Sequence, residues 1–462
     1  MVSPAARGEL RRRCRGELLE DAAALLPYAR DFGGLVERMP AVVLRPSSAD
    51  SVSAALAVAR EHRLPVSTRG AGHAQSGQSL GSGLVLDMTA LGRVLAFDEE
   101  RSLVEVEGGA TWRSVVDAAF TRGCLPLGLT NAVDTTIAGT LSVGGVGAET
   151  HRVGPQVDVV AWLDVATLDG RVVRASADEH SDLFDAVRAG LGQCGVVVRA
   201  GYPVRPCRPR LRTQCFVYDR ADALVHDAST FADPDSAGRF VAATTTRDPL
   251  RADRLMLWLF VGQEHAGGEP PAPLRPTAAV FEAPPKDTPL WSRDGVPGHP
   301  FFHLTSAENG AGRREPGVNP WTEHFLTLEA GTAALDHVLS RGHAALGDAG
   351  GSAGAILVRR PRSRAPLFLT PEAELSFGLG VYARFASGAA QAAVDGVEQY
   401  LASARRFGGN RYLSGYVRYS ADDWKRQFGA AFEPFTLAKH RYDEHGLLNG
   451  GFVAWPASRS AG

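Results

Sequence analysis

Three observations predict an α+β fold of two domains. The chain has 462 residues, which is enough for two domains around a large buried core. Short strand and helix patterns alternate through about the first 200 residues, and three glycine clusters interrupt them. Beyond about Val204 the composition changes, because residues 204–260 carry apolar stretches without tight glycine clusters. We therefore expect the first domain to end near residue 204.

The elements of the first domain follow from capping residues and periodicity. The first 45 residues resemble a helical lead-in, and Ser47 with Asp50 gives a capping-box-like start to the next helix. Thr111 caps a later helix that Gly123 ends, and Ser181 begins another. The predicted strands are 65–68, 84–87, 103–107, the hairpin of 159–168 with 172–173, and 196–200.

The second half of the chain predicts another sheet with helices. Residues 265–300 hold many of the prolines and are predicted to form a long irregular connection. Residues 321–329 and 355–359 are predicted as strands, flanked by helices over 330–346 and 389–406. The tail over 422–442 has a helical pattern rich in aromatic residues.

Composition excludes several classes of partner. The net charge of -2 gives no field that would attract nucleic acid, and no basic run suggests a membrane surface. The first 19 residues lack the apolar stretch of a secretory signal, so we expect a cytoplasmic protein. The five cysteines include no C-x-x-C pair, so neither a disulfide framework nor a zinc site is expected.

The first glycine cluster, Arg69-Gly70-Ala71-Gly72-His73, follows a predicted strand. Such a loop can surround a phosphate with backbone N–H donors. It does not fit a Rossmann fingerprint, because no helical pattern follows Gly72. On the residues alone, two interpretations stay open, namely an ordinary tight turn with a structural histidine and a dinucleotide-binding loop of another kind.

The segment from Thr68 to Gln78 resembles the flavin-attachment segment of cytokinin dehydrogenases, which belong to the vanillyl-alcohol-oxidase group. That family has R-G-x-G-H-S-x-x-G-Q, and its histidine bonds to the flavin 8α-methyl. The resemblance implies FAD linked covalently to His73. The other positions carried over from this segment are Arg69, Gly70, Ala71, Gly72, Ala74, which replaces the family serine, Gly77 and Gln78.

Further segments extend the resemblance across the chain. Residues 136–142 resemble the family's T-V-G-G-T-L-S, residues 182–195 its E-L-F-x-A-V-x-G-G-L-G-Q, and residues 412–443 its closing segment. The resemblance therefore implies a two-domain FAD-binding fold of the vanillyl-alcohol-oxidase (PCMH) type. Residues 1–204 and 408–462 would form the FAD-binding domain, and 205–407 an inserted α+β substrate-binding domain.

The resemblance also implies other flavin contacts, and the chain departs from it at one position near the C-terminus. The contacts are Asn131, Thr136, Gly139, Ser142, Val146, Val197 and Tyr412. Phe452 stands where the family has a glutamine near the flavin edge. Some enzymes of the wider group have a second, cysteine link just before the middle glycine cluster. Here that stretch holds Asp134-Thr135-Thr136 and Cys124 is too early, so a single link is expected.

The catalytic base of cytokinin dehydrogenases is missing. Their aspartate, five residues before the threonine of T-V-G-G, corresponds to Asn131, whose amide cannot take up a proton in this way. Asn131 can still hydrogen-bond a substrate or the flavin. Two carboxylates are candidates for the base, Asp134 in the same loop and Glu323 on a predicted strand of the second domain. We expect Glu323.

These residues predict an FAD-dependent oxidase or dehydrogenase. A hydride would leave a C–H bond next to nitrogen or oxygen of a small organic substrate, for example one of secondary metabolism, and dioxygen or another acceptor would reoxidise the flavin. The alternative is a flavoprotein on the same scaffold that binds a ligand or catalyses a redox-neutral cyclisation. The replaced aspartate and glutamine motivate that alternative. Neither nucleic acid nor a membrane is an expected partner.

Overall fold

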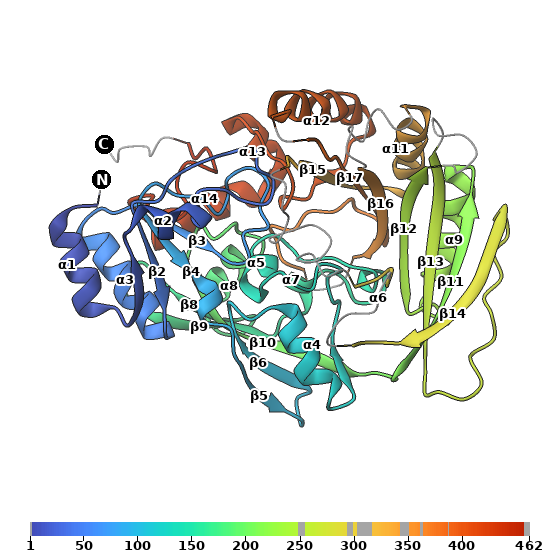
Figure 1. Ribbon diagram of the computed structural model, residues 1–462, viewed down its shortest axis with the longest axis horizontal. Coiled ribbons are helices and arrows are strands. Elements are labelled where there is room, and N and C mark those ends of the chain that lie inside the picture. Colours follow the sequence, from blue (N-terminus) through green and yellow to red (C-terminus); the bar gives the residue numbers. More distant parts are fainter. Residues whose placement is uncertain are drawn as a thin grey trace.

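Three β-sheets organise the part of the chain that the computed structural model describes, namely residues 2–247, 255–292, 299–302, 317–341, 351–360, 364–386 and 388–456. Figure 1 shows the first two sheets at the N-terminal side of the molecule and the third at the opposite side. Short 3₁₀ turns occur at Leu26–Tyr28, Met88–Ala90, Arg405–Phe407 and Gly429–Ala431.

The first sheet has the order β1-β2-β4-β3 and carries the first glycine loop at the end of β3. Helices α1 and α3 pack on it and share its apolar core, in which Leu56 and Leu86 are fully buried. Helix α3 begins after Ser48, whose Oγ accepts a hydrogen bond from Ser51 N at 3.2 Å, one residue later than predicted. The elements are α1 (Pro4–Arg13), β1 (Gly16–Leu19), α2 (Ala22–Leu25), β2 (Val42–Pro46), α3 (Ala49–Glu61), β3 (Val66–Arg69) and β4 (Leu84–Asp87).

The second sheet has the order β5-β6-β10-β8-β9, and β7 pairs with the far end of β10. The predicted hairpin is confirmed as β8 and β9, and the predicted cap at Thr111 accepts from Ser114 N. Its elements are β5 (Val94–Asp98), β6 (Leu103–Glu107), α4 (Trp112–Phe120), β7 (Cys124–Pro126), β8 (Trp162–Ala166), β9 (Val172–Ser176), α8 (Ser181–Val187) and β10 (Val196–Pro206).

Short helices in and just after the second glycine cluster, residues 137–147, lie at the centre of the molecule (Figure 1). They are α5 (Ile137–Leu141), α6 (Thr150–Val153) and α7 (Gln156–Val159). Helix α6 contacts strand β16 of the third sheet. The second glycine cluster therefore lies where the two halves of the chain meet.

The third sheet has the order β14-β11-β13-β12-β16-β17-β15-β18. Helices α9, α11 and α12 share an apolar core with one of its faces, in which Val338, Val397 and Leu379 are buried. The opposite face is turned toward the first half of the chain, and Phe240 and Phe325 join the core of that half. The elements are β11 (Arg210–Tyr218), α9 (Ala221–Phe231), β12 (Phe240–Arg247), β13 (Leu255–His265), β14 (Phe281–Pro289), β15 (Trp321–Leu326), α11 (Leu328–Arg341), β16 (Ser352–Arg359), β17 (Leu375–Tyr382), α12 (Ala390–Ala404) and β18 (Asn410–Arg411).

Three sequence predictions are wrong in part. The lead-in contains strands β1 and β2 besides its helices. The proline-rich stretch contains strand β14, which tolerates Pro284 and Pro285 because it is an edge strand with a register shift opposite them. The strand predicted over 321–329 ends at Leu326, and residues 342–346 of the predicted helix lie outside the described residues.

The C-terminal segment returns to the first two sheets, as Figure 1 shows. Helices α13 (Ala421–Phe428) and α14 (Phe432–Tyr442) confirm the predicted helical tail. Beyond them Leu448 forms a bridge with Val66 at the start of β3. Both ends of the chain thus support the first glycine loop.

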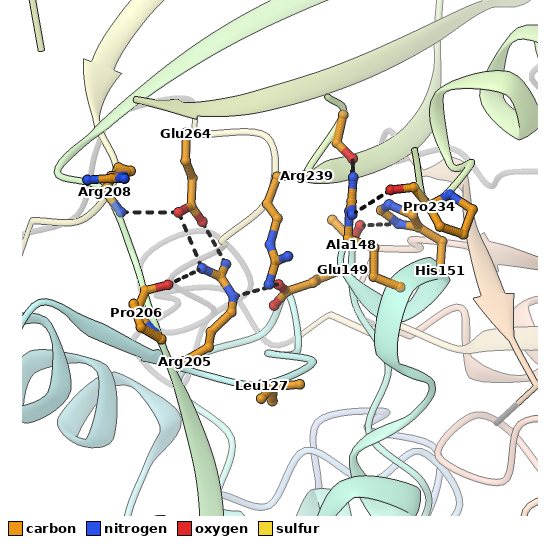
Figure 2. A network of polar contacts seen from close by, with 12 residues as sticks. Leu127, Ala148, Glu149, His151, Arg205, Pro206, Arg208, Pro234, Arg239 and Glu264 are labelled. Atoms are coloured by element: carbon orange, nitrogen blue, oxygen red, sulfur yellow. Dashed lines mark hydrogen bonds and ion pairs between the residues drawn. The ribbon is translucent and has the colours of Figure 1, made fainter. Parts of the chain in front are cut away.

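A buried ion network joins the first half of the chain to the third sheet (Figure 2). Arg205, at the end of β10, contacts Glu149 at 2.7 Å and Glu264 of β13 at 2.6 Å. Arg239, just before β12, also pairs with Glu149, whose side chain is only 1% exposed. Val241 N donates to Ala148 O at 2.9 Å next to the network. The ion pairs and this backbone hydrogen bond together hold the third sheet against the first half of the chain.

Candidate active site

A cavity of about 710 Å³ lies between the glycine clusters and the face of the third sheet that is turned toward the first half of the chain. This volume is within the roughly 300–1,000 Å³ typical of small-molecule sites. Most of the predicted site residues line it, and they come from both halves of the chain. These residues are Gly70, Ala71, Gly72, His73, Ala74, Gln78, Asn131, Thr136, Gly139, Ser142, Val146, Val197, Glu323 and Tyr412.

The first glycine loop lines the cavity and leaves several of its backbone N–H groups without an internal acceptor. Gly72 O and Ala74 O accept from Phe32 N at 2.9 Å and Gly33 N at 3.0 Å, so these carbonyls are directed toward the N-terminal segment. The N–H groups of residues 71–74 have no acceptor among the described residues. A run of free N–H groups is an anion-binding concavity. The loop therefore fits a pyrophosphate such as that of FAD.

The first two glycine clusters pack against each other at Thr136. Its Oγ1 accepts from Gly139 N at 3.3 Å and caps α5. A Cβ on Gly70 would collide with the same oxygen, and a Cβ on Gly139 would lie 2.8 Å from it. Glycine is required at both positions for this close approach.

His73 lies between two aromatic rings at the cavity wall. Its ring centroid is 4.6 Å from that of Phe32 and 4.8 Å from that of Trp321. Burial lowers the pKa of His73 to about 4, opposed by the negative charge of Asp134. The imidazole is therefore neutral at pH 7, and a neutral ring nitrogen can act as a nucleophile.

Arg69 and Gly77, two of the predicted flavin contacts, lie outside the residues that line the cavity. The Arg69 guanidinium packs under Gly72 and donates to Arg30 O at 3.0 Å. Gly77 N donates to the Asp31 carboxylate at 2.6 Å. These contacts stabilise the conformation of the first glycine loop on its side away from the cavity.

The two candidates for the catalytic base lie in different surroundings. Asp134 is not among the lining residues, and its carboxylate pairs with Arg113 at 2.7 Å. Glu323 lines the cavity and accepts hydrogen bonds from Tyr382 OH at 2.7 Å and Ser414 Oγ at 3.4 Å. Burial raises the pKa of Glu323, although both hydrogen bonds oppose that shift. This geometry favours Glu323.

Tyr382 was not found by sequence reasoning, because its role depends on contacts across strands. A Cβ on Gly380 would lie 2.5 Å from Tyr382 OH, and one on Gly354 would lie 3.1 Å from the ring. The ring thus lies over two glycines of β17 and β16 to reach Glu323. Burial and the neighbouring Glu323 carboxylate raise the pKa of Tyr382 well above its ordinary value, so its hydroxyl keeps its proton.

Asn131 presents a donor to the cavity. Its Oδ1 accepts from Ala148 N at 3.0 Å, which fixes the orientation of the amide. The Nδ2 group has no acceptor among the described residues and stays available to a ligand. Where the resembled family has a proton acceptor, this chain therefore has a donor.

The third glycine cluster, residues 190–195, and the chain end close the cavity. Asn449 was missed by sequence reasoning, yet its Nδ2 donates to Gly192 O at 2.7 Å and its Oδ1 accepts from Thr68 N at 3.0 Å. Tyr412 OH accepts from Gly145 N at 3.0 Å. Phe452 packs against Trp424 with centroids 5.5 Å apart and is not among the lining residues.

Other classes of site are not found in the described part of the chain. It contains no group of three or more His, Cys, Asp or Glu side chains that could hold a metal ion. None of its helices is long and apolar enough to cross a membrane. All five cysteines are free, and none is among the residues that line the cavity.

Comparison with known proteins identifies the cofactor. Residues 40–176 match a family described as an FAD binding domain. The chain is 39% identical over 211 residues to cytokinin dehydrogenase 1 of Oryza sativa subsp. japonica, covering 44% of this chain and 40% of that one. It is 28% identical over 441 residues to an uncharacterized oxidoreductase of the fasciation locus of Rhodococcoides fascians, covering 94% and 97%. The chain thus matches less than half the length of the rice enzyme.

Solved structures confirm the fold class. A carbohydrate oxidase from Microdochium nivale superposes with a TM-score of 0.76 at 15% identity, over 98% of this chain and 99% of that one. The 6-hydroxy-D-nicotine oxidase from Arthrobacter nicotinovorans gives 0.69 at 18% identity, over 96% and 98%. The predicted α+β fold of vanillyl-alcohol-oxidase type is therefore confirmed. Over less than half of its length the chain is similar to cytokinin dehydrogenases, and residues 40–176 match an FAD binding domain.

Proposed function

We propose that this FAD-binding relative of cytokinin dehydrogenases is an oxidase or dehydrogenase acting on a small organic molecule. One observation carries the proposal, namely that a single cavity joins the first glycine loop to the half-buried Glu323–Tyr382 pair. Bound FAD supplies an oxidised ring that accepts a hydride from a C–H bond next to nitrogen or oxygen.

The residues of the cavity have separate tasks in this proposal. The free N–H groups of residues 71–74 bind the pyrophosphate. Glu323 Oε2 takes the proton from the substrate heteroatom, while Tyr382 holds Oε1 through its hydrogen bond. We further propose that residues 1–204 with 408–462 form the FAD-binding domain and 205–407 the substrate-binding domain.

We propose that FAD is bound covalently, through His73 alone. The neutral imidazole on the cavity wall supports this link, and the absence of cysteines from the lining supports a single one. Acid-precipitated protein should stay yellow and fluoresce in a denaturing gel. If the His73→Ala variant kept its flavin after denaturation, this attachment site would be wrong.

The substrate is proposed to differ from cytokinins. Asn131 presents a donor where cytokinin dehydrogenases place their base, so isopentenyladenine should reduce the flavin slowly. An anaerobic screen of alcohols and amines, read by bleaching of the yellow flavin band, tests the proposed class of reaction. Reoxidation by dioxygen or by another acceptor can be followed in the same cuvette. If no alcohol or amine bleached the flavin, the redox-neutral alternative would be favoured.

A further inference from the structure

Phe32, His73 and Trp321 form a three-ring cluster whose members come from different parts of the chain. The His73 ring contacts the other two at 4.6 and 4.8 Å, and Phe32 and Trp321 contact each other at 5.4 Å. Phe32 precedes the first sheet's strand β2, whereas Trp321 begins strand β15 of the third sheet. The imidazole is thus held by both halves of the molecule.

Backbone hydrogen bonds also connect the His73 loop to the third sheet. Gly33 N donates to Ala74 O at 3.0 Å on one side, and Gly33 O accepts from Asn319 N at 3.1 Å on the other. The segment around Gly33 is therefore a brace between the His73 loop and the strand that carries Trp321. A displacement of the third sheet would move both the brace and one of the two rings that contact the imidazole.

We propose that Phe32 and Trp321 clamp the His73 imidazole for covalent attachment of FAD, so that attachment requires the third sheet to be docked. This inference rests on the proposed attachment at His73. The two rings are positioning residues, because they act through His73. They fix the plane of the imidazole and exclude water from it, and exclusion of water keeps it neutral.

The attachment reaction balances with dioxygen as the oxidant. One C–H bond of the 8α-methyl group and the N–H bond of the imidazole break, and a bond forms between that nitrogen and the 8α carbon. The two electrons and two protons released reduce the isoalloxazine ring. Dioxygen then removes them as hydrogen peroxide, which restores the oxidised ring.

Charged groups surround the clamp on each element packed against it. Asp134 favours the protonated imidazole. Asp31 and Arg69 lie behind the loop, and burial raises the pKa of Asp31 to about 6. Arg30 precedes Phe32 and donates to Gly34 O, and Glu323 shares strand β15 with Trp321. Removal of a ring would admit water to His73 and relieve the desolvation that lowers its pKa, so the His73 pKa would rise toward its ordinary 6.5.

The test uses the full chain, produced without a riboflavin supply and then incubated with FAD. The covalent fraction is measured over time from the mass and the fluorescence of the denatured protein, between about pH 5 and 7. Attachment to the wild type should vary little over this range, because the His73 pKa is about 4. Trp321→Ala should attach FAD roughly tenfold more slowly or worse, with a further loss below about pH 6.5.

Three variants make the outcome decisive. Trp321→Phe should restore most of the rate, and Phe32→Leu should repeat the defect even if Trp321→Ala does not fold. Trp258→Ala is the matched control, because Trp258 lies on the same sheet and outside the cavity lining. Wild-type rates and pH dependence in both Trp321→Ala and Phe32→Leu would overturn the clamp. Covalent FAD in His73→Ala would instead overturn the proposed attachment site.

Discussion

Glu323 is a half-buried carboxylate on the cavity wall, and the two hydrogen bonds it accepts leave it able to take up a proton. Tyr382 donates to Oε1 at 2.7 Å, and the contact from Ser414 to Oε2 is longer, at 3.4 Å. The more loosely held oxygen is therefore the better acceptor for a substrate proton. A raised pKa brings a carboxylate closer to working pH, which makes it a more effective base.

Replacing Glu323 with glutamine should slow flavin reduction by roughly 10²-fold or more in single turnover, because a positioned base is removed. In the wild type the rate should rise with pH, since the acceptor form is lost as pH falls through the raised pKa of Glu323. This limb should lie above the ordinary value of 4.5 and vanish in Glu323→Gln. Asp134→Asn serves as control and should reduce within a few-fold of wild type. Rapid reduction in Glu323→Gln would exclude Glu323 as the base.

Asn131→Asp should create a second proton acceptor in the cavity. One carboxylate oxygen keeps the hydrogen bond from Ala148 N, and the other takes the place of the free amide group. Reduction of the flavin by isopentenyladenine should become faster by roughly 10²-fold, measured anaerobically. An unchanged rate would mean that more than this residue separates the chain from cytokinin dehydrogenases.

Strand β17 has glycine at the point where Tyr382 needs space. A Cβ at Gly380 would press on the Tyr382 hydroxyl at 2.5 Å, so Gly380→Ala should displace the ring from Glu323. We expect slower flavin reduction and a shifted pH limb, with FAD still bound. Gly396→Ala in helix α12 is the control, because its Cβ meets only Phe385 at 3.6 Å and should slightly stabilise the helix. Equal rates of flavin reduction in the two variants would show that the position of Tyr382 does not affect the reaction.

Helix α14 connects the chain end to the glycine clusters through a buried ion pair. Lys439 Nζ lies 2.6 Å from Asp443, which also accepts from Leu447 N and Leu448 N at 2.8 Å. Asp443→Asn leaves the Lys439 charge unpaired, which costs roughly 3–5 kcal/mol of unfolding free energy. Asn449 should then release Gly192, with loss of FAD content after gel filtration. Glu433→Gln, exposed on the same helix, should behave as wild type in denaturant titration.

Truncation at about residue 405 extends the same reasoning to the whole element. It removes α13, α14 and Asn449, so Thr68 and Gly192 lose the side chain that joins them. We expect the shortened chain to retain no FAD. A truncated protein that purified with its flavin would contradict the role proposed for the C-terminal segment.

Most residues of the candidate site could be predicted from local sequence motifs, but the contacts that bring them together from distant parts of the chain could not. The glycine loops were predictable because glycines such as Gly70 and Gly139 are required by short-range geometry that a motif records. Tyr382, Asn449 and Phe32 were not predictable, because their roles depend on partners hundreds of residues away or on another strand. Strand β14 was not predictable, because proline is tolerated in a strand only at a sheet edge and the order of strands in a sheet depends on distant segments.

At the scale of the whole molecule, the site exists only where the third sheet meets the first two. Trp321 and Glu323 come from that sheet, whereas His73 and Asn131 come from the first half of the chain. Val241 N and Arg359 Nε each donate to carbonyls of the segment between Ala148 and His151. The same segment carries Glu149, the centre of the ion network in Figure 2.

Glu149 is the residue whose replacement tests this network. Glu149→Gln keeps the shape of the side chain but removes the carboxylate that Arg205 and Arg239 share, and only Glu264 would remain to balance Arg205. Because Glu149 is buried, its loss leaves uncompensated charge, at a cost of roughly 3–5 kcal/mol in unfolding free energy. Flavin reduction should slow as well, because the sheet that carries Glu323 is held less firmly.

The control is Glu372→Gln, which breaks the Arg360 pair at a side chain that is 83% exposed. Exposed pairs contribute only about 0–1 kcal/mol, so this variant should unfold nearly as the wild type does. Denaturant titrations of both variants, each with its single-turnover rate, separate the two effects. If Glu149→Gln matched Glu372→Gln in both measurements, the backbone contacts at Ala148 and His151 would suffice to dock the sheet. A loss of stability with an unchanged rate would mean that the network supports the fold without setting the geometry of the cavity.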